Sequence, residues 1–78
     1  MKIYDILPQG ARRLFGNRLK SLRLKRGLSQ KEFAARTGYT RSYVLQVENG
    51  HYSASLDAII AFANVLKVIP ADLLKDIL

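Results

Sequence analysis

Residues 29–50, SQKEFAARTGYTRSYVLQVENG, decide the fold of this chain. Ser29 and Glu32 form a capping box, in which each side chain accepts a hydrogen bond from a backbone N–H group at the start of a helix. This pattern predicts a helix that begins at Gln30, and Gly38 breaks it after about Thr37. The first element of the stretch is therefore a short helix.

A second short helix follows almost at once. Thr40 can cap a helix over residues 41–49, and Gly50 can stop it. Val44 and Val47 are three residues apart and would face inward. Two short helices joined by a tight turn that contains glycine are typical of the helix-turn-helix motif, whose second helix can enter the major groove of DNA.

One helix is predicted before this motif. Its apolar residues recur at spacings of four, four and three, which places them on one stripe: Ala11, Phe15, Leu19 and Leu22. Gly27 would end the helix as a left-handed cap. Residues 1–9 are predicted to form an extended, apolar arm, because Pro8 disfavours helix at the residue before it. The domain itself is predicted over residues 10–78.

Two further helices are predicted after the motif. Ser55 can cap a helix that runs to about Lys67, and this helix is apolar on most of its circumference, so we expect it at the centre of the core. Pro70 suits the first turn of a last helix over residues 71–78. The chain is therefore predicted to be all-α, a five-helix domain with a central helix-turn-helix.

Charge is unevenly distributed along the 78 residues. Thirteen Lys and Arg oppose six Asp and Glu, which gives a net charge of +7. Residues 1–51 hold eleven basic and three acidic side chains, whereas residues 52–78 hold two basic and three acidic ones. A balance of this sign favours a polyanionic partner, and its contact surface is expected in the first two thirds of the chain.

Several classes of protein are excluded by composition. The chain has no cysteine and one histidine, His51, so neither a disulfide framework nor a metal site is expected. No nucleophile with a base, pair of carboxylates or phosphate-binding glycine loop can be assembled, so we expect no enzymatic activity and no cofactor. No apolar stretch is long enough for a membrane helix or a signal peptide, which predicts a cytoplasmic protein without a membrane partner.

The residues of the motif also carry a family resemblance: Gln30, Ala34, Gly38, Val44 and Val47, followed by Glu48, Asn49 and Gly50. They resemble the helix-turn-helix of the phage-repressor and Cro family, and the resemblance covers roughly residues 12–74. Within that family, residues 41–44, Val47-Glu48 and Ser55-Leu56 are most similar to the controller proteins of restriction-modification systems. The resemblance implies a transcription regulator that binds double-stranded DNA.

Base-reading roles follow from the same resemblance. They fall on Arg41, Ser42 and Gln46, with Thr40 and Tyr43 beside them at the start of the recognition helix. An arginine can bind guanine O6 and N7 together, a glutamine can bind adenine N6 and N7, and a serine can donate or accept. Leu45 stands where the family is usually polar, and we expect it on the surface.

The resemblance further implies phosphate contacts and one ion pair. Gln30 matches a residue that meets backbone phosphate, and the phosphate neighbours after the recognition helix are Asn49, His51, Tyr52 and Ser53. Arg23 and Glu48 match a pair that ties the first helix to the end of the recognition helix. Lys67 departs from the glycine that is common after the fourth helix, and Ile69 from a capping serine.

A homodimer is predicted, because the last helix has more apolar surface than a small core can absorb: Leu73, Leu74, Ile77 and Leu78. Such a dimer would bind a palindromic operator. Two alternatives stay open, a phage-type repressor and an antitoxin that also binds a partner protein. RNA polymerase and a toxin are the further partners considered, and RNA binding through the basic face is a third class of function.

Overall fold

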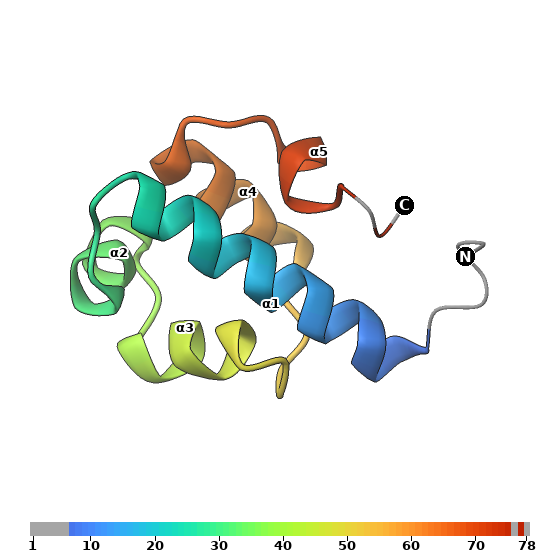
Figure 1. The fold of residues 1–78 in the computed structure, drawn as a ribbon. Helices are drawn as coiled ribbons and strands as arrows, with labels where there is room; N and C mark the ends of the chain where they lie inside the picture. The colour runs from blue at the N-terminus through green and yellow to red at the C-terminus, as the bar shows by residue number, and fades with distance from the viewer. Residues whose placement is uncertain (1–6, 76, 78) are drawn as a thin grey trace.

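The computed structural model describes residues 7–75 and residue 77, and five helices make up its architecture (Figure 1). They are α1 (Pro8–Lys25), α2 (Gln30–Thr37), α3 (Arg41–Glu48), α4 (Leu56–Leu66) and α5 (Pro70–Leu73). The described residues contain no strand, so the all-α prediction is confirmed. Within residues 7–75 no helix is both long and apolar enough to cross a lipid bilayer.

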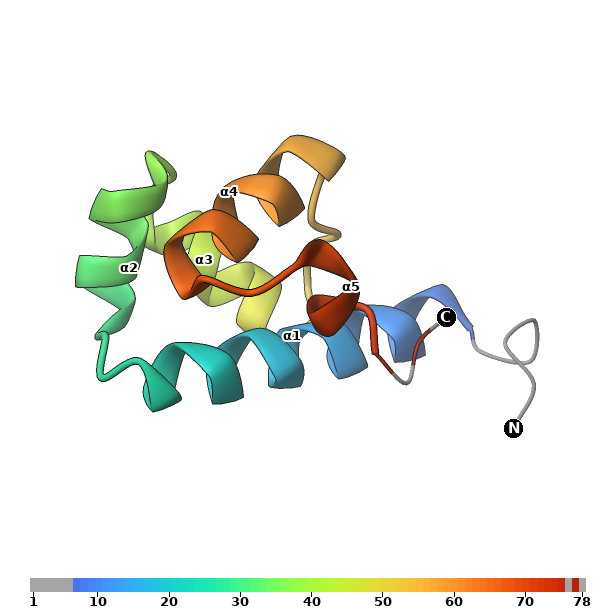
Figure 2. The same ribbon diagram turned by 90° about the horizontal axis from the view of Figure 1, so that it is seen from above.

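The longest helix, α1, organises the packing. It contacts α3, α4 and α5, while α2 packs against α3 and α4. Figures 1 and 2 show α2 beyond the C-terminal end of α1 and α5 beside its N-terminal half. The core between these helices contains twelve apolar residues: Phe15, Leu19, Leu28, Phe33, Ala34, Val44, Val47, Ala58, Phe62, Ala63, Leu66 and Leu73.

Local capping sets where α2, α3 and α4 begin. The Ser29 hydroxyl accepts the Glu32 N–H at 3.0 Å, and the Glu32 carboxylate accepts the Ser29 N–H at 3.0 Å. The hydroxyl of Thr40 accepts the N–H three residues later at 3.0 Å, and that of Ser55 does so at 3.1 Å. The capping residues predicted for these three helices are thus confirmed, because caps depend on near neighbours alone.

Both ends of the chain differ from the sequence prediction. Pro8 and Gln9 belong to α1 rather than to the arm predicted over residues 1–9, and residues 1–6 lie outside the described part. Proline suits the first turn of a helix because its missing N–H has no intrahelical partner there. At the other end α5 stops at Leu73, well before the predicted residue 78.

The helix α4 ends without a glycine at its C-cap. Lys67 adopts the left-handed conformation with φ of 57°, the one non-glycine residue with positive φ in the described chain. Arg26 of the turn after α1 donates from Nε to the Leu66 carbonyl at 2.8 Å. The next helix lacks a side-chain cap, but Asp72 accepts the Ile69 N–H at 3.2 Å and fixes its start. The two departures from the family pattern are therefore accommodated locally.

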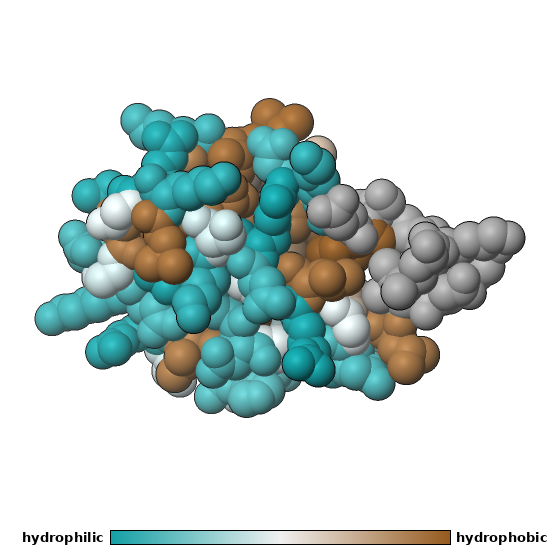
Figure 3. Space-filling model, in the orientation of Figure 1, coloured by the Kyte–Doolittle hydropathy of each residue, from teal (hydrophilic) through white to brown (hydrophobic). Residues whose placement is uncertain are grey.

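The helix α4 packs against α1, α2 and α5, as predicted for the centre of the core, but part of it is exposed. Leu56 and Ile60, one turn apart, are 74% and 43% exposed, whereas Phe62 and Leu66 are fully buried. Figure 3 shows that the face carrying α1 is mostly hydrophilic, with apolar surface gathered beside α5 and the start of α1.

Candidate nucleic-acid interface

The first turn of α3 presents polar side chains to solvent. Thr40, Arg41 and Ser42 are exposed, and the Thr40 hydroxyl is engaged in capping the helix. Among the described residues the only ion pair joins Arg23 and Glu48, so no carboxylate neutralises the Arg41 guanidinium. A long cationic side chain and a hydroxyl are thus free at the start of this helix.

Tyr43 lies in an aromatic cluster and is only partly exposed. Its ring stacks on Tyr39 with centroids 5.1 Å apart and lies 6.4 Å from that of Phe62. Its hydroxyl accepts the Ser55 N–H at 3.3 Å and donates to the Ser53 carbonyl at 3.5 Å. The side chain therefore connects α3 to the start of α4, and part of it remains exposed beside Arg41.

Gln46 is paired with the turn that follows α3. Its backbone carbonyl accepts the N–H groups of His51 and Tyr52 at 2.9 and 3.3 Å. Its side-chain Oε1 lies 2.8 Å from Nδ1 of His51, which is exposed. The sequence prediction assigned these two residues to bases and to phosphate separately, whereas the structure joins them.

The C-terminal end of α3 is anchored by a buried ion pair. Arg23 donates from Nε and Nη2 to the two carboxylate oxygens of Glu48 at 2.7 and 3.0 Å, and the side chains are 6% and 1% exposed. A third donor of Arg23 reaches the Leu28 carbonyl at 2.7 Å. Gln30 also donates one amide N–H to Glu48 at 3.0 Å. Both α1 and α2 are thus fixed to the one carboxylate of α3.

Two glycines allow α1 to approach this anchored end closely, and sequence reasoning gave neither a packing role. A Cβ on Gly16 would lie 2.4 Å from the Val47 carbonyl oxygen and 2.5 Å from that of Glu48. Gly50 has φ of 78°, and a Cβ there would lie 2.7 Å from Cγ of Arg13. A glycine inside a helical pattern, as at Gly16, was the available signal of a close approach.

A polar hollow lies between the start of α1 and the end of α3. It is lined by Gln9, Arg12, Arg13, Asn49, Gly50 and His51, without any acidic residue among them. Arg12 donates weakly to the Gly50 carbonyl at 3.4 Å, while Arg13 is exposed. Tyr52 and Ser53 continue the exposed turn away from the hollow. The region is cationic and adjoins the recognition helix.

Several arginines of the basic first two thirds serve the fold. Arg18 donates to the Asp72 carbonyl at 3.0 Å, as Arg26 does to that of Leu66. With Arg23, these side chains bind backbone or carboxylate oxygen inside the protein. Basic groups that remain exposed on the α2 and α3 side are Lys31, Arg36 and Arg41. The charge asymmetry of the sequence therefore overstates the surface available to a polyanion.

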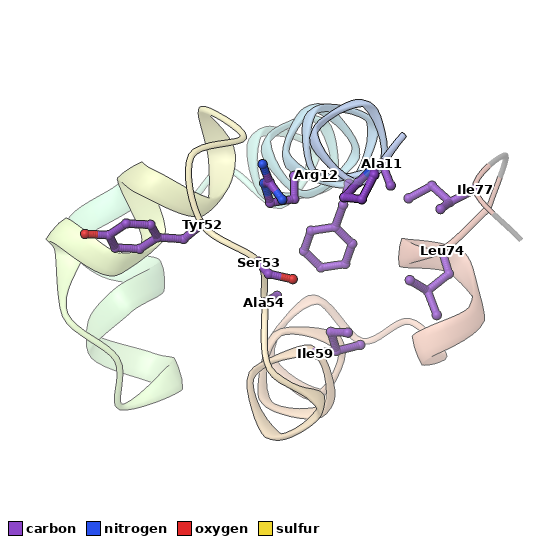
Figure 4. A pocket seen from close by; sticks show the side chains of 10 residues that line it. Ala11, Arg12, Tyr52, Ser53, Ala54, Ile59, Leu74 and Ile77 are labelled. Carbon is purple, nitrogen blue, oxygen red and sulfur yellow. The ribbon is translucent and has the colours of Figure 1, made fainter. Parts of the chain in front are cut away.

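The predicted dimer residues separate into three groups. Leu73 has no exposed surface, so the core of the single chain absorbs it and a partner cannot reach it. Leu74 and Ile77 are partly exposed and line an apolar pocket together with Ala11, Phe15 and Ile59 (Figure 4). Leu78 lies outside the described residues. The prediction for Leu73 is thus wrong, because the short α5 turns that residue inward.

Sequence and structure comparisons agree on the class of this chain. A family described as helix-turn-helix matches residues 19–74. The control protein C.BamHI of Bacillus amyloliquefaciens is 38% identical over 69 residues, which cover 87% of this chain and 85% of that protein. The crystal structure of the restriction-modification controller protein C.AhdI from Aeromonas hydrophila matches with a TM-score of 0.78 and 42% identity, over 80% of this chain and 94% of that one.

A longer protein shares part of the same sequence. The propionyl-CoA carboxylase regulator of Cereibacter sphaeroides is 44% identical over 48 residues, which are 62% of this chain. The match covers only 10% of that regulator. The shared segment is therefore a small part of that protein, while the two controller proteins match over most of their length.

Proposed function

Because this chain belongs to the helix-turn-helix family and is a DNA-binding regulator rather than an enzyme, we propose that it works as a homodimer on a palindromic operator, as a controller protein of a restriction-modification system. The observation that carries this proposal is the exposed first turn of α3, where Arg41 has no acidic partner among the described residues. The two controller proteins, similar over most of both chains, support the subclass.

Base recognition is assigned to Arg41, Ser42 and Gln46. The first two stand at the N-terminal end of α3, the end of a recognition helix that contacts base edges in this motif. Gln46 lies one turn further along and keeps its amide nitrogen available, since only its oxygen faces His51. Arginine suits guanine, whereas glutamine and serine suit several bases. Thr40 adjoins them as the capping residue.

Phosphate contacts are assigned to the two regions that flank α3. Asn49, His51, Tyr52 and Ser53 form an exposed turn after the helix. At the start of α2, Gln30 has one N–H of its amide on Glu48, so the second amide N–H, the backbone N–H and the helix dipole remain for a phosphate. Contacts on both sides would fix the depth of α3 in the groove.

The homodimer is supported by apolar surface on α4 and on the segment that follows α5. Leu56 and Ile60 are exposed on α4, and Leu74 and Ile77 are partly exposed near the apolar pocket. Burial of such side chains against a second copy would stabilise a dimer by removing them from water. Ile60→Asp should therefore shift sedimentation toward the monomer, whereas Asn17→Asp on the exposed side of α1 should not. A chain that is monomeric at high micromolar concentration would contradict this interface.

Selection of bound duplexes from a random pool tests the function directly. A dimer should enrich a pseudo-palindrome whose half-site centres lie roughly 34 Å, about one turn of DNA, apart. Affinity should fall by about 10³ to 10⁵ between roughly 50 and 200 mM salt if 6 to 10 phosphates are contacted. Absence of any enriched sequence, or a flat salt response, would contradict the proposal.

A further inference from the structure

His51 and Gln46 form a side-chain pair at the end of the recognition helix. The ring Nδ1 of His51 lies 2.8 Å from Oε1 of Gln46, and the His51 backbone N–H is bound to the Gln46 carbonyl. We propose that His51 is a positioning residue for base recognition, which sets the orientation of the Gln46 carboxamide. This inference rests on the proposed function, because it takes Gln46 as a base-reading residue.

The orientation matters because a carboxamide has two different ends. Its oxygen accepts hydrogen bonds and its nitrogen donates two, so a half turn about the terminal bond exchanges an acceptor for a donor. With the oxygen on His51, the nitrogen is the end left for DNA. A donor suits the acceptors N7 and O6 of guanine, N7 of adenine or O4 of thymine, whereas an acceptor suits the amino groups of cytosine and adenine.

The ring of His51 decides whether the half turn is allowed. With a proton on Nδ1, the ring donates to the Gln46 oxygen, which is the atom that faces it at 2.8 Å. After a half turn the Gln46 nitrogen would face the same N–H group, and two donors cannot pair. A donor at this position therefore holds the Gln46 oxygen toward the ring.

The surroundings leave His51 free for this role. From α1, Arg12 and Arg13 are the charged groups that line the hollow with it, and neither accepts a hydrogen bond. Glu48 of α3 is buried on Arg23 and Gln30. No carboxylate among the described lining residues competes with Gln46 for the ring N–H. The pair is therefore the main polar contact of the ring within the described protein.

The test is random-pool selection with the full chain. The wild type is compared with Gln46→Ala, His51→Ala and the variant that carries both changes. Loss of His51 should relax preference at the same base position as loss of Gln46, by about two- to tenfold, the range of one ordinary hydrogen bond. Because His51 acts through Gln46, His51→Ala should cause no further loss of preference once residue 46 is alanine.

Two controls separate positioning from simple phosphate binding. Asn49→Ala changes another polar residue of the same hollow and should weaken all sequences alike. His51→Lys keeps a hydrogen-bond donor, so it should hold more of the wild-type base preference than His51→Ala does. All variants should show wild-type thermal unfolding, since the residues are exposed or partly exposed.

Uniform weakening by His51→Ala, additive with Gln46→Ala, would overturn the inference and leave His51 as a phosphate contact. Non-additive effects confined to one base position support it. A wild-type protein that enriches no sequence would instead overturn the proposed function, and this inference with it. The two failures are therefore distinguishable in the same experiment.

Discussion

At the C-terminal end of α3 the Glu48 carboxylate is bound by Arg23 and Gln30, while at the N-terminal end Arg41 and Ser42 stand in solvent. The anchored end is also where α1 approaches most closely, over Gly16. The contrast shows how contacts at one end can hold a helix of eight residues in a single orientation. Because the C-terminal end of α3 makes these contacts, the side chains at its N-terminal end are left available for another molecule.

Breaking the anchored end should have the largest effect. Glu48→Ala removes the carboxylate and leaves the Arg23 guanidinium buried without its partner, a change that should lower the free energy of unfolding by about 3–5 kcal/mol. Urea denaturation measures it. Arg41→Ala at the free end should stay within about 0.5 kcal/mol of the wild type. Equal losses for the two variants would remove the distinction between the ends.

Closing the space at Gly16 should disturb the same end through packing. Gly16→Ala places a methyl group against backbone carbonyls of residues 47 and 48, which cannot rotate away, so α1 and α3 must separate. We expect a loss of about 1–3 kcal/mol, as for other overpacked sites. Asn17→Ala, the exposed neighbour on α1, is the control for helix propensity. An unchanged denaturation midpoint for Gly16→Ala would disprove the close approach.

The free end is tested by DNA binding rather than stability. Arg41→Ala should lower operator discrimination by about 1–3 kcal/mol and relax preference at one base position per half-site. Lys31→Ala, a change of an exposed cation on α2, should weaken all sequences alike. Random-pool selection with both variants compares the profiles. Uniform weakening by Arg41→Ala would instead make that residue a phosphate contact.

The smallest expected effect is on the pH dependence of stability, through a carboxyl group at the start of α2. This helix begins with Gln30, which binds the anchored end of α3. The Ser29 backbone N–H and its hydroxyl, together with Arg36, hold the pKa of Glu32 below its ordinary value of 4.5. A carboxyl whose pKa is lower in the folded chain contributes stability above the unfolded value, and this contribution is lost as pH falls through the folded value. Glu32→Gln should therefore show a weaker loss of thermal stability below about pH 4.5 than the wild type. Identical acid profiles would contradict the lowered pKa.

Sequence alone predicted what depends on near neighbours. The caps Ser29, Thr40 and Ser55 fixed three helix starts, because each bonds a residue three positions away. Contacts between distant residues were not accessible in this way. Arg18 reaches a carbonyl 54 positions along the chain, and Tyr43 joins an aromatic cluster with Phe62. Charge and aromaticity alone do not show in which direction such side chains point.

The ends of the chain illustrate the same limit. Proline was a signal for a helix start at Pro70 and also at Pro8, but the apolar residues before Pro8 favoured an arm. Leu73 was grouped with the other apolar residues of the last helix, and only the packing of α5 on α4 and α1 shows that it faces inward. Partition of apolar side chains between a core and an interface is a property of the tertiary structure.

Lys67 marks a position at which a substitution could make the protein more stable. A side chain in the left-handed region is strained by about 1–2 kcal/mol, and glycine at that position would relieve the steric part of it. The residue is exposed at the end of α4, away from α3 and the residues assigned to DNA. In evolutionary terms, one substitution there would widen the stability margin and let the recognition helix accept destabilising changes that alter specificity.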